Sequence, residues 1–302
     1  MVIINEENEV IAKTYQNNDN IVNTIIKCLE ELSKQINIHD LNVLGVGCTG
    51  SGREFTKVVV GADTIKTEIL AHLTATQHYV KDINTIFDIG GEDCKIITLH
   101  QGEWDGYIMN NICGAGTGAV LTNVANLLNI DINDVGEIAL KSTNKLSFPG
   151  KCGVLCQSAV INRKNMGAKN EDILMGVCRA LINNYLTLTK NLDLEKPFVF
   201  QGMTAKNKAL VKALSEQLNE DIIVLDDCEY MGAIGIALLA KEETIKKTKF
   251  RGFELDTDKI RTRSFVCDKC SNSCEILQIY YENKFVDSLN SKCGLWNNKE
   301  RS

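Results

Sequence analysis

The chain has 302 residues, of which 44% are hydrophobic, and this is enough apolar sequence to fill one large domain or two smaller ones. The net charge of −6 argues against a nucleic-acid-binding protein, which normally carries a basic surface. The opening residues MVIINEENEV do not resemble a signal peptide, and no run of about 18 apolar residues predicts a membrane span. We therefore expect a cytoplasmic protein with neither a membrane nor a nucleic-acid partner.

Strands and helices alternate along most of the chain, which is the pattern of an α/β protein. Residues 1–15 carry two short apolar runs around a turn and predict a β-hairpin, and residues 19–36 have the spacing of an amphipathic helix. A buried strand that ends in a glycine turn is expected at 41–52. Two strands around a Gly-Gly turn at 85–99 and a third strand at 102–110 follow.

The alternation continues to about residue 242. The expected elements are helices near 115–128, 132–141 and 171–190, a strand at 198–202, a helix at 205–218, a strand at 221–225 and a helix at 230–241. A charged connector, KEETIKKTKFRG, then precedes a short cysteine-bearing segment that is too small to hold a core unaided. We place a domain boundary there, between residues 1–241 and residues 242–302.

Several glycine turns are candidates for phosphate binding. GVGCTG, at residues 45–50, fits the dinucleotide pattern G-x-G-x-x-G, but the segment after it is not a strong helix, so the pattern is weak evidence. FDIGGEDCK is more informative, because Asp88 ends a strand and Gly90-Gly91 forms a turn tight enough for backbone N–H groups to meet a phosphate. Such a carboxylate holds Mg²⁺ or orients a water, although a plain hairpin turn remains the alternative.

Two later glycine positions fit the same scheme. Gly202 lies between an expected strand and helix, and Gly232 lies at the start of the last expected helix. In actin-like ATPases the adenosine lies across such a turn and helix. The order of these motifs, separated by whole α/β units, favours an actin-like ATPase over a chance set of turns.

The twelve cysteines fall into three groups: five isolated ones, three in mid-chain, Cys156 among them, and four in the last 36 residues. Five of them are isolated in apolar patterns and are expected to be small buried residues: Cys28, Cys48, Cys94, Cys178 and Cys228. Cys113 and Cys152 each stand beside a glycine just before an apolar helical stretch. A helix N-terminus is electropositive and favours an anionic iron–sulfur cluster. Two such cysteines are half of a four-cysteine ligand set, which a two-fold dimer would complete.

A catalytic cysteine–histidine pair is the rival interpretation of the mid-chain cysteines. The chain has 4 histidines, and none of them has a flanking signature of such a pair. The expected iron–sulfur ligands are therefore preferred.

The last four cysteines have metal-site spacing. Cys267, Cys270 and Cys274 form the pattern C-x₂-C-x₃-C, and Cys293 follows 19 residues later. Four thiolates suit Zn²⁺ or an iron–sulfur cluster. The residues between Cys274 and Cys293 read as a hairpin, and reduced thiols without a metal are the alternative.

Taken together, the motifs over roughly residues 1–241 resemble one family. The chain is similar to the ATPase activators of 2-hydroxyacyl-CoA dehydratases, grouped with the ATPase subunits of benzoyl-CoA reductases. The matching segments are TGSGRE at 49–54, DIGGED at 88–93, NNICGAGTGAVL at 110–121, KCGVLCQSAVI at 151–161 and QGMTAKN at 201–207. The chain also resembles the second module and cysteine-rich tail of the long, two-module members.

The resemblance implies an actin-like fold of two lobes and a homodimer. It implies one 4Fe-4S cluster bridged between two subunits by the residues matching Cys113 and Cys152. It further implies that ATP and Mg²⁺ drive transfer of one electron from a donor such as ferredoxin or flavodoxin to a dehydratase-type iron–sulfur enzyme. Asp88 is then the catalytic residue, and the nucleotide contacts are Gly90, Gly91, Gly116, Thr117, Gly118, Gly202, Asn207 and Gly232.

The chain departs from the family pattern at several places, among them Glu92, which replaces a glutamine, and Gln157 and Ala159, which replace two acids. It starts after the first strand and its G-S-T-T phosphate loop, so we expect an N-terminally truncated version of the fold, and Met203 replaces a glycine of the adenosine loop. These departures leave a second hypothesis open: a non-hydrolysing regulatory or structural module of a split or larger activase-like protein. A sugar or acetate kinase of the same fold is a third, weaker hypothesis.

Overall fold

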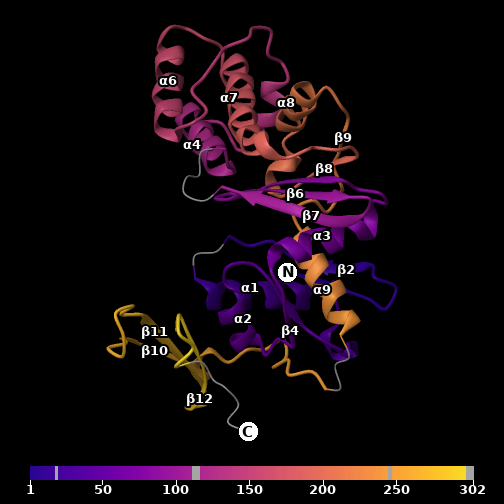
Figure 1. Cartoon of the computed structure of the whole chain (residues 1–302), viewed down its shortest axis with the longest axis vertical. Helices are drawn as coiled ribbons and strands as arrows, with labels where there is room; N and C mark the ends of the chain where they lie inside the picture. Colours follow the sequence, from indigo (N-terminus) through magenta and orange to yellow (C-terminus); the bar gives the residue numbers. More distant parts are fainter. Residues whose placement is uncertain (18–19, 111–115, 244–246, 297–302) are drawn as a thin grey trace. The chain divides into compact units, whose positions relative to one another are not determined.

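The structure is a computed structural model, and it describes residues 1–17, 20–110, 116–243 and 247–296 (Figure 1). The chain divides into two units. The first consists of Met1–Ala75 together with Gly232–Ser302, and the second of Thr76–Met231. Within the described residues, no helix is both long and apolar enough to cross a bilayer.

The second unit is built on a five-stranded sheet in the order β7-β6-β5-β8-β9. Its strands are β5 (Thr85–Ile89), β6 (Cys94–His100), β7 (Glu103–Met109), β8 (Phe198–Gln201) and β9 (Ile222–Ile223). The first three form an antiparallel meander, whereas β8 and β9 run parallel to β5. All five strands were predicted, although β9 is shorter than the apolar run at 221–225 indicates.

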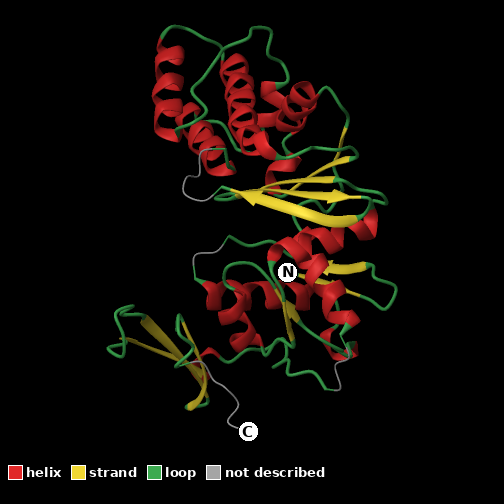
Figure 2. Ribbon diagram, in the orientation of Figure 1, coloured by secondary structure: helices red, strands yellow, loops and turns green. Residues whose placement is uncertain are grey.

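The helices of this unit lie mainly on one side of the sheet (Figure 2). They are α4 (Gly118–Leu128), α5 (Val135–Ala139), α6 (Gly153–Asn165), α7 (Asn170–Tyr185) and α8 (Lys208–Leu218). Two short 3-10 helices, η2 (Leu186–Asn191) and η3 (Met203–Lys206), follow α7 and β8. The predicted helix over 171–190 is therefore α-helical only as far as Tyr185.

Alternation along β5 decides which side chains meet the helices. Phe87 and Ile89 pack with Phe200 of β8 and Tyr185 of α7 in the main hydrophobic core. Successive side chains of a strand point to opposite faces, so Asp88 lies on the other face of the sheet. A polar residue is thereby kept out of the apolar core, although Asp88 itself is buried.

The first unit opens with the predicted hairpin, in which β1 (Val2–Ile4) pairs antiparallel with β2 (Val10–Lys13). The predicted amphipathic helix is α1 (Ile21–Gln35), capped by the Asn20 side chain, which accepts from the Asn23 N–H. The remaining elements are η1 (Ile38–Asp40), β3 (Gly47–Cys48), α2 (Arg53–Val60), β4 (Thr64–Ile65), α3 (Glu68–Tyr79), which continues into the second unit, and α9 (Met231–Glu242).

Two expectations for the region after residue 40 are wrong. The strand predicted at 41–52 is reduced to Gly47–Cys48, and the segment after it, described as lacking a strong helical pattern, contains helix α2. The strand pairs with β4 over these two residues only, and a Cβ at Gly47 would lie 2.7 Å from the Ile236 carbonyl oxygen of α9. Helix α2 forms because Val58, Val59 and Val60 are buried, which overrides their low helix propensity.

The C-terminal segment forms a three-stranded antiparallel sheet in the order β10-β11-β12. Its elements are η4 (Thr257–Lys259), β10 (Ile260–Val266), β11 (Glu275–Tyr281) and β12 (Lys284–Leu289). The hairpin expected between the tail cysteines is confirmed as β11 and β12, whereas β10 was not predicted. The domain boundary near residue 242 stays a prediction.

Candidate functional site

Three polar side chains form a row across the centre of the five-stranded sheet. Strand pairing places Asp88 of β5 opposite Lys95 of β6 on one side and opposite Gln201 of β8 on the other. All three residues are buried. The Thr76 hydroxyl donates a hydrogen bond to Gln201 Oε1 at 3.0 Å. Buried polar groups need hydrogen-bond partners, and Thr76 and Lys95 supply two such contacts in this row.

Lys95 carries a buried positive charge between two carboxylates. Its Nζ lies 2.9 Å from Asp88 Oδ2 and 3.1 Å from Asp93 Oδ2. Its backbone carbonyl accepts a hydrogen bond from the Tyr185 hydroxyl at 2.5 Å, which ties β6 to α7. Burying an unpaired charge is very costly, so Lys95 and Asp88 compensate each other inside the protein.

Two glycine turns meet at the end of β5. The Gly118 N–H donates to the Gly90 carbonyl oxygen at 2.9 Å, and the Ala119 N–H donates to the Gly91 carbonyl oxygen at 2.8 Å. Every helix N-terminus exposes such N–H groups, and here they attach the first turn of α4 to the Gly-Gly turn. The structure thus brings together four of the predicted phosphate contacts: Gly90, Gly91, Thr117 and Gly118.

A third segment, the turn after β8, joins them. The Thr204 hydroxyl donates to the Ile89 carbonyl oxygen at 2.6 Å. Gly202 has φ of 88° and ψ of 166°, a conformation essentially confined to glycine. A Cβ there would lie 2.5 Å from the Ile89 carbonyl oxygen and 2.9 Å from Asp88 Oδ1. Glycine is therefore required for this turn to approach Asp88.

These three segments form a cradle whose main chains come so close together that a side chain would not fit at the glycine positions. A Cβ at Gly118 would lie 3.0 Å from Thr204 Cγ2 and 3.2 Å from the Gly90 carbonyl oxygen. Glycine turns at a helix N-terminus fit phosphate groups, because the backbone comes close and the helix dipole favours negative charge. The residues present therefore fit the triphosphate of a nucleotide, and Asp88 is the carboxylate that the Gly202 turn approaches.

The other predicted nucleotide contacts lie in different settings. Gly116, with φ of 100°, precedes α4, and a Cβ there would lie 3.1 Å from Asn184 Nδ2. Asn207 caps α8, since its side chain accepts from the Ala209 and Leu210 N–H groups. Gly232 lies at the start of α9 in the first unit, beside the His72 ring. Asn207 thus stabilises the start of α8, and contact with a nucleotide would be an additional role.

Cys152 is the N-cap residue of α6, as the sequence pattern predicts, and its side chain is partly exposed. A Cβ at the next residue, Gly153, would lie 3.3 Å from Val120 Cγ2 in the first turn of α4. The start of α6 therefore packs against the start of α4, the helix that Cys113 precedes in sequence. Cys113 itself lies outside the described residues.

The five isolated cysteines are buried, which confirms their assignment as small apolar residues: Cys28, Cys48, Cys94, Cys178 and Cys228. Burial raises the pKa of Cys48, Cys94 and Cys178 to about 12. Cys156, one turn after Cys152, is also buried, and its pKa rises to about 11 for the same reason. A thiol of such high pKa is neither a nucleophile nor a ready metal ligand.

The tail cysteines lie at one end of the C-terminal sheet. Cys267 and Cys274 are buried, whereas Cys270 and Cys293 are exposed. Among the residues that the structure describes, no group of three or more His, Cys, Asp or Glu side chains is arranged to hold a metal ion. The Cys267 sulfur instead accepts a hydrogen bond from Trp296 Nε1 at 3.2 Å.

Sequence reasoning missed Lys95 and Thr204, which both contact the end of β5. A lysine inside the apolar run CKIITL is the available signal, because a charge on a buried strand needs a partner. Its partner is fixed by the pairing of β5 with β6, and the sequence pattern does not specify that register.

The model of the BadF/BadG/BcrA/BcrD ATPase family matches residues 1–240. The 2-hydroxyisocaproyl-CoA dehydratase activator of Clostridioides difficile is 32% identical over 214 residues, which cover 67% of this chain and 80% of that protein. The (R)-2-hydroxyglutaryl-CoA dehydratase activating ATPase of Acidaminococcus fermentans is 27% identical over 245 residues, which cover 81% of this chain and 94% of that protein.

Solved structures agree with the sequence comparison. The activator of the 2-hydroxyisocaproyl-CoA dehydratase from Clostridium difficile, solved with bound ADPNP, superimposes with a TM-score of 0.74 at 29% identity. The match covers 79% of this chain and 88% of that one. The fold of the chain is accordingly that of the activator ATPases, which is actin-like.

Proposed function

Because the chain belongs to the BadF/BadG/BcrA/BcrD ATPase family, we propose that it is an ATP-dependent activator of a 2-hydroxyacyl-CoA dehydratase-type enzyme. The observation that carries the proposal is the meeting of three segments around Asp88: the Gly90-Gly91 turn, the start of α4 and the Gly202 turn. ATP bound with Mg²⁺ supplies an energy-rich phosphoanhydride bond. The glycine turns bind its phosphates, and Asp88 acts as the catalytic residue that orients the attacking water.

The proposed electron carrier is a 4Fe-4S cluster held by Cys113 and Cys152 of two subunits. A cluster of this type takes four cysteine thiolates, and a two-fold axis duplicates each pair. Cys152 supports the assignment because it begins a helix, where the dipole stabilises an anionic cluster. When bound, the cluster supplies one low-potential electron. The electron donor is of the ferredoxin or flavodoxin class.

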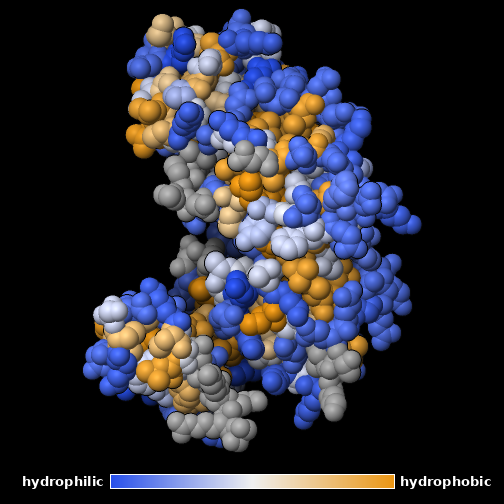
Figure 3. All heavy atoms as spheres, in the orientation of Figure 1, coloured by the Kyte–Doolittle hydropathy of each residue, from blue (hydrophilic) through white to orange (hydrophobic). Residues whose placement is uncertain are grey.

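Helix α6 supports the proposed homodimer. Four large apolar side chains on or next to it are exposed to solvent in the single chain: Val154, Leu155, Ile161 and Met166. Apolar side chains also gather over α6, at the upper left of Figure 3. Exposed apolar patches on soluble domains commonly mark association surfaces. Val154 and Leu155 directly follow the Cys152-Gly153 start of the helix, so association there would bring two copies of Cys152 together.

A second candidate, a non-hydrolysing regulatory module, is favoured by one contact. The Lys95 ammonium lies on Asp88 Oδ2 at 2.9 Å inside the protein, and a carboxylate engaged in this way is less available to a water. In this alternative the cluster or the tail metal has a structural or sensing role, and ATP binds without turnover.

Measurement of ATP turnover by the anaerobically purified chain separates the two candidates. The activator hypothesis predicts hydrolysis that falls ~100-fold or more in Asp88→Asn, since a positioned acid or base contributes that much. Asp134→Asn is the matched control, because Asp134 is exposed and makes no side-chain capping bond at the start of α5, so turnover is expected to stay unchanged. Turnover by the unmodified chain no higher than by Asp88→Asn contradicts hydrolysis and supports the regulatory module.

A further inference from the structure

The pairing of β10 with β11 brings two tail cysteines together. The last pair of the ladder is Val266 opposite Glu275, so Cys267 and Cys274 come next in register. The Cys267 N–H donates to the Cys274 carbonyl oxygen at 2.8 Å, which continues the ladder by one step. Both side chains are buried, in a small cluster with Ile276, Phe265 and Trp296. Two thiols are thus held side by side at the end of the β10–β11 pair.

The other two cysteines lie within reach of the same place. Cys270 belongs to the short loop that joins Cys267 to Cys274. On the other edge of β11, the ladder ends with Leu277 opposite Leu289. Continuation of this register past Leu289 carries the chain toward Cys274, and four residues span at most ~13–14 Å. Cys293 is four residues beyond Leu289, so its thiol can reach Cys274.

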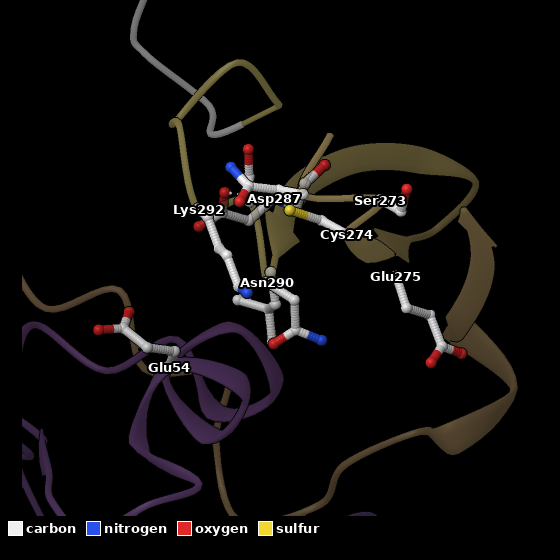
Figure 4. Close-up of a pocket in the computed structure, with 11 residues that line it drawn as sticks. Glu54, Ser273, Cys274, Glu275, Asp287, Asn290 and Lys292 are labelled. Atoms are coloured by element: carbon white, nitrogen blue, oxygen red, sulfur yellow. Dashed lines mark hydrogen bonds between the residues drawn. The ribbon is translucent and has the colours of Figure 1, made fainter. Parts of the chain in front are cut away.

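A hollow lies beside Cys274, which is the one tail cysteine in its lining. The pocket has a volume of about 890 Å³, and its lining includes Ser273 and Cys274 on one side and Asn290, Ser291 and Lys292 on the other. Figure 4 shows the Cys274 sulfur at the wall of this pocket, facing the segment that carries Asn290 and Lys292. There is therefore room between the two segments for a bound ion.

The Cys267 sulfur already receives the kind of contact that supports a metal-bound thiolate. Trp296 Nε1–H is a hydrogen-bond donor only, and it lies 3.2 Å from this sulfur. Donors to ligand atoms orient a metal site and tune its charge. The Trp296 ring also packs edge-on against Phe265, with ring centroids 5.0 Å apart, and so covers this end of the sheet.

We propose that Cys267, Cys270, Cys274 and Cys293 bind one Zn²⁺ ion, which closes the end of the C-terminal sheet as a structural tetrathiolate site. The proposal is independent of the nucleotide site and of the mid-chain cluster. A sheet with such a small apolar cluster needs an additional stabilising cross-link, and a structural Zn²⁺ ion bound by four cysteines is a common one. Cys270 and Cys293, which are exposed, close onto the ion when it binds.

The spacing of the ligands favours a single ion over a 4Fe-4S cluster. Neighbouring thiolates on one tetrahedral Zn²⁺ are ~3.8 Å apart, since each Zn–S bond is ~2.3 Å. Cys267 and Cys274 occupy directly paired positions of adjacent strands, which suits this short separation. In a 4Fe-4S cluster each cysteine binds a different iron atom, so the thiolates stand farther apart.

The test is the metal content of the full chain, measured in Cys152→Ser so that the mid-chain cluster ligand is absent. We expect about one zinc per chain. Replacement of zinc by Co²⁺ should give the intense visible bands of a tetrahedral thiolate site. Cys270→Ser or Cys293→Ser in the same background should weaken zinc binding at least ~10-fold in competition with a chromogenic chelator. Ser271→Ala, in the same loop, is the control and should bind zinc as before.

A second measurement avoids the question of whether a variant folds. In the unmodified chain, a zinc chelator should make the four tail thiols react with an alkylating reagent together, as read by peptide mass spectrometry. The buried Cys178 should stay unmodified throughout. Tail thiols that react equally with and without chelator, or an iron chromophore in place of zinc, would overturn the proposal.

Discussion

Lys95 shows how one side chain decides the character of the candidate site. It is a charged residue on a buried strand, and its ammonium lies between the carboxylates of Asp88 and Asp93. The charge of Asp88 is therefore balanced by the protein itself. This contact belongs both to the stability of the sheet and to the chemistry of the site, because the same carboxylate is the proposed catalytic group.

The first prediction concerns this ion pair. Lys95→Met should lower the free energy of unfolding by about 3–5 kcal/mol, because it leaves a carboxylate buried without its partner. The double variant Asp88→Asn/Lys95→Met should recover most of that loss, since both charges are then removed. Chemical denaturation of the unmodified chain, of Lys95→Met, of Asp88→Asn and of the double variant measures the coupling.

The control uses an exposed pair of the same type. Lys208 Nζ lies 2.7 Å from Glu137 Oε1, and both side chains are largely in water. Lys208→Met should leave the unfolding midpoint unchanged, because water screens such a pair. Equal loss of stability in Lys95→Met and Lys208→Met would show that burial does not increase the contribution of the Lys95–Asp88 pair to stability.

At the scale of elements, the site depends on the turn after β8 coming very close to the end of β5. Gly202 makes this possible, with φ of 88° and with no room for a Cβ beside the Ile89 carbonyl oxygen. Asp88 and the Gly90-Gly91 turn keep their geometry only if this turn stays in place.

Gly202→Ala should therefore destabilise the chain by about 1–3 kcal/mol through backbone strain, and the steric clash adds to that cost. Nucleotide affinity should fall as well, as measured by titration with a fluorescent ATP analogue. Gly106→Ala on β7 is the control, because a Cβ there would meet only Thr98 Oγ1, at 3.8 Å. It should change stability by less than about 0.5 kcal/mol. The assignment of Gly202 fails if both variants behave alike.

Periodicity predicted most elements of the nucleotide-binding part, and its failures have physical causes. The strands β5, β6 and β8 were visible because each carries a concentrated apolar run between glycine or polar turns. Helix α2 was missed because valines favour strands, and only their burial makes this segment helical. Strand β10 was missed because most of its side chains are exposed and its pairing with β11 defines it.

The site itself was predicted in part. The glycines around Asp88 could be named from their motifs, since each motif is local in sequence. The ion pair with Lys95 and the hydrogen bond from Thr204 to Ile89 could not, because both arise from strand register and from a turn more than a hundred residues away. Gly232 and Asn207 remain predictions as nucleotide contacts.

At the scale of the whole molecule, the proposed nucleotide site is joined to the proposed electron carrier. The link is the packing of the start of α6, with Cys152, against the first turn of α4, which also binds the Gly90-Gly91 turn. A change in the phosphates at that turn would act on α4 and, through it, on Cys152. ATP hydrolysis and the cluster are thereby proposed to be coupled by two short helices.

The most direct test is the iron bound at Cys152 and its response to ATP. Anaerobic reconstitution should give a dimer with one 4Fe-4S cluster, about two iron atoms per chain, and with ATP-dependent reduction of a dehydratase partner. Cys152→Ser should lose both, whereas Cys156→Ser, one turn further along α6 and buried, should keep both. A cluster that forms unchanged in Cys152→Ser, or electron transfer that proceeds without ATP, would contradict the account.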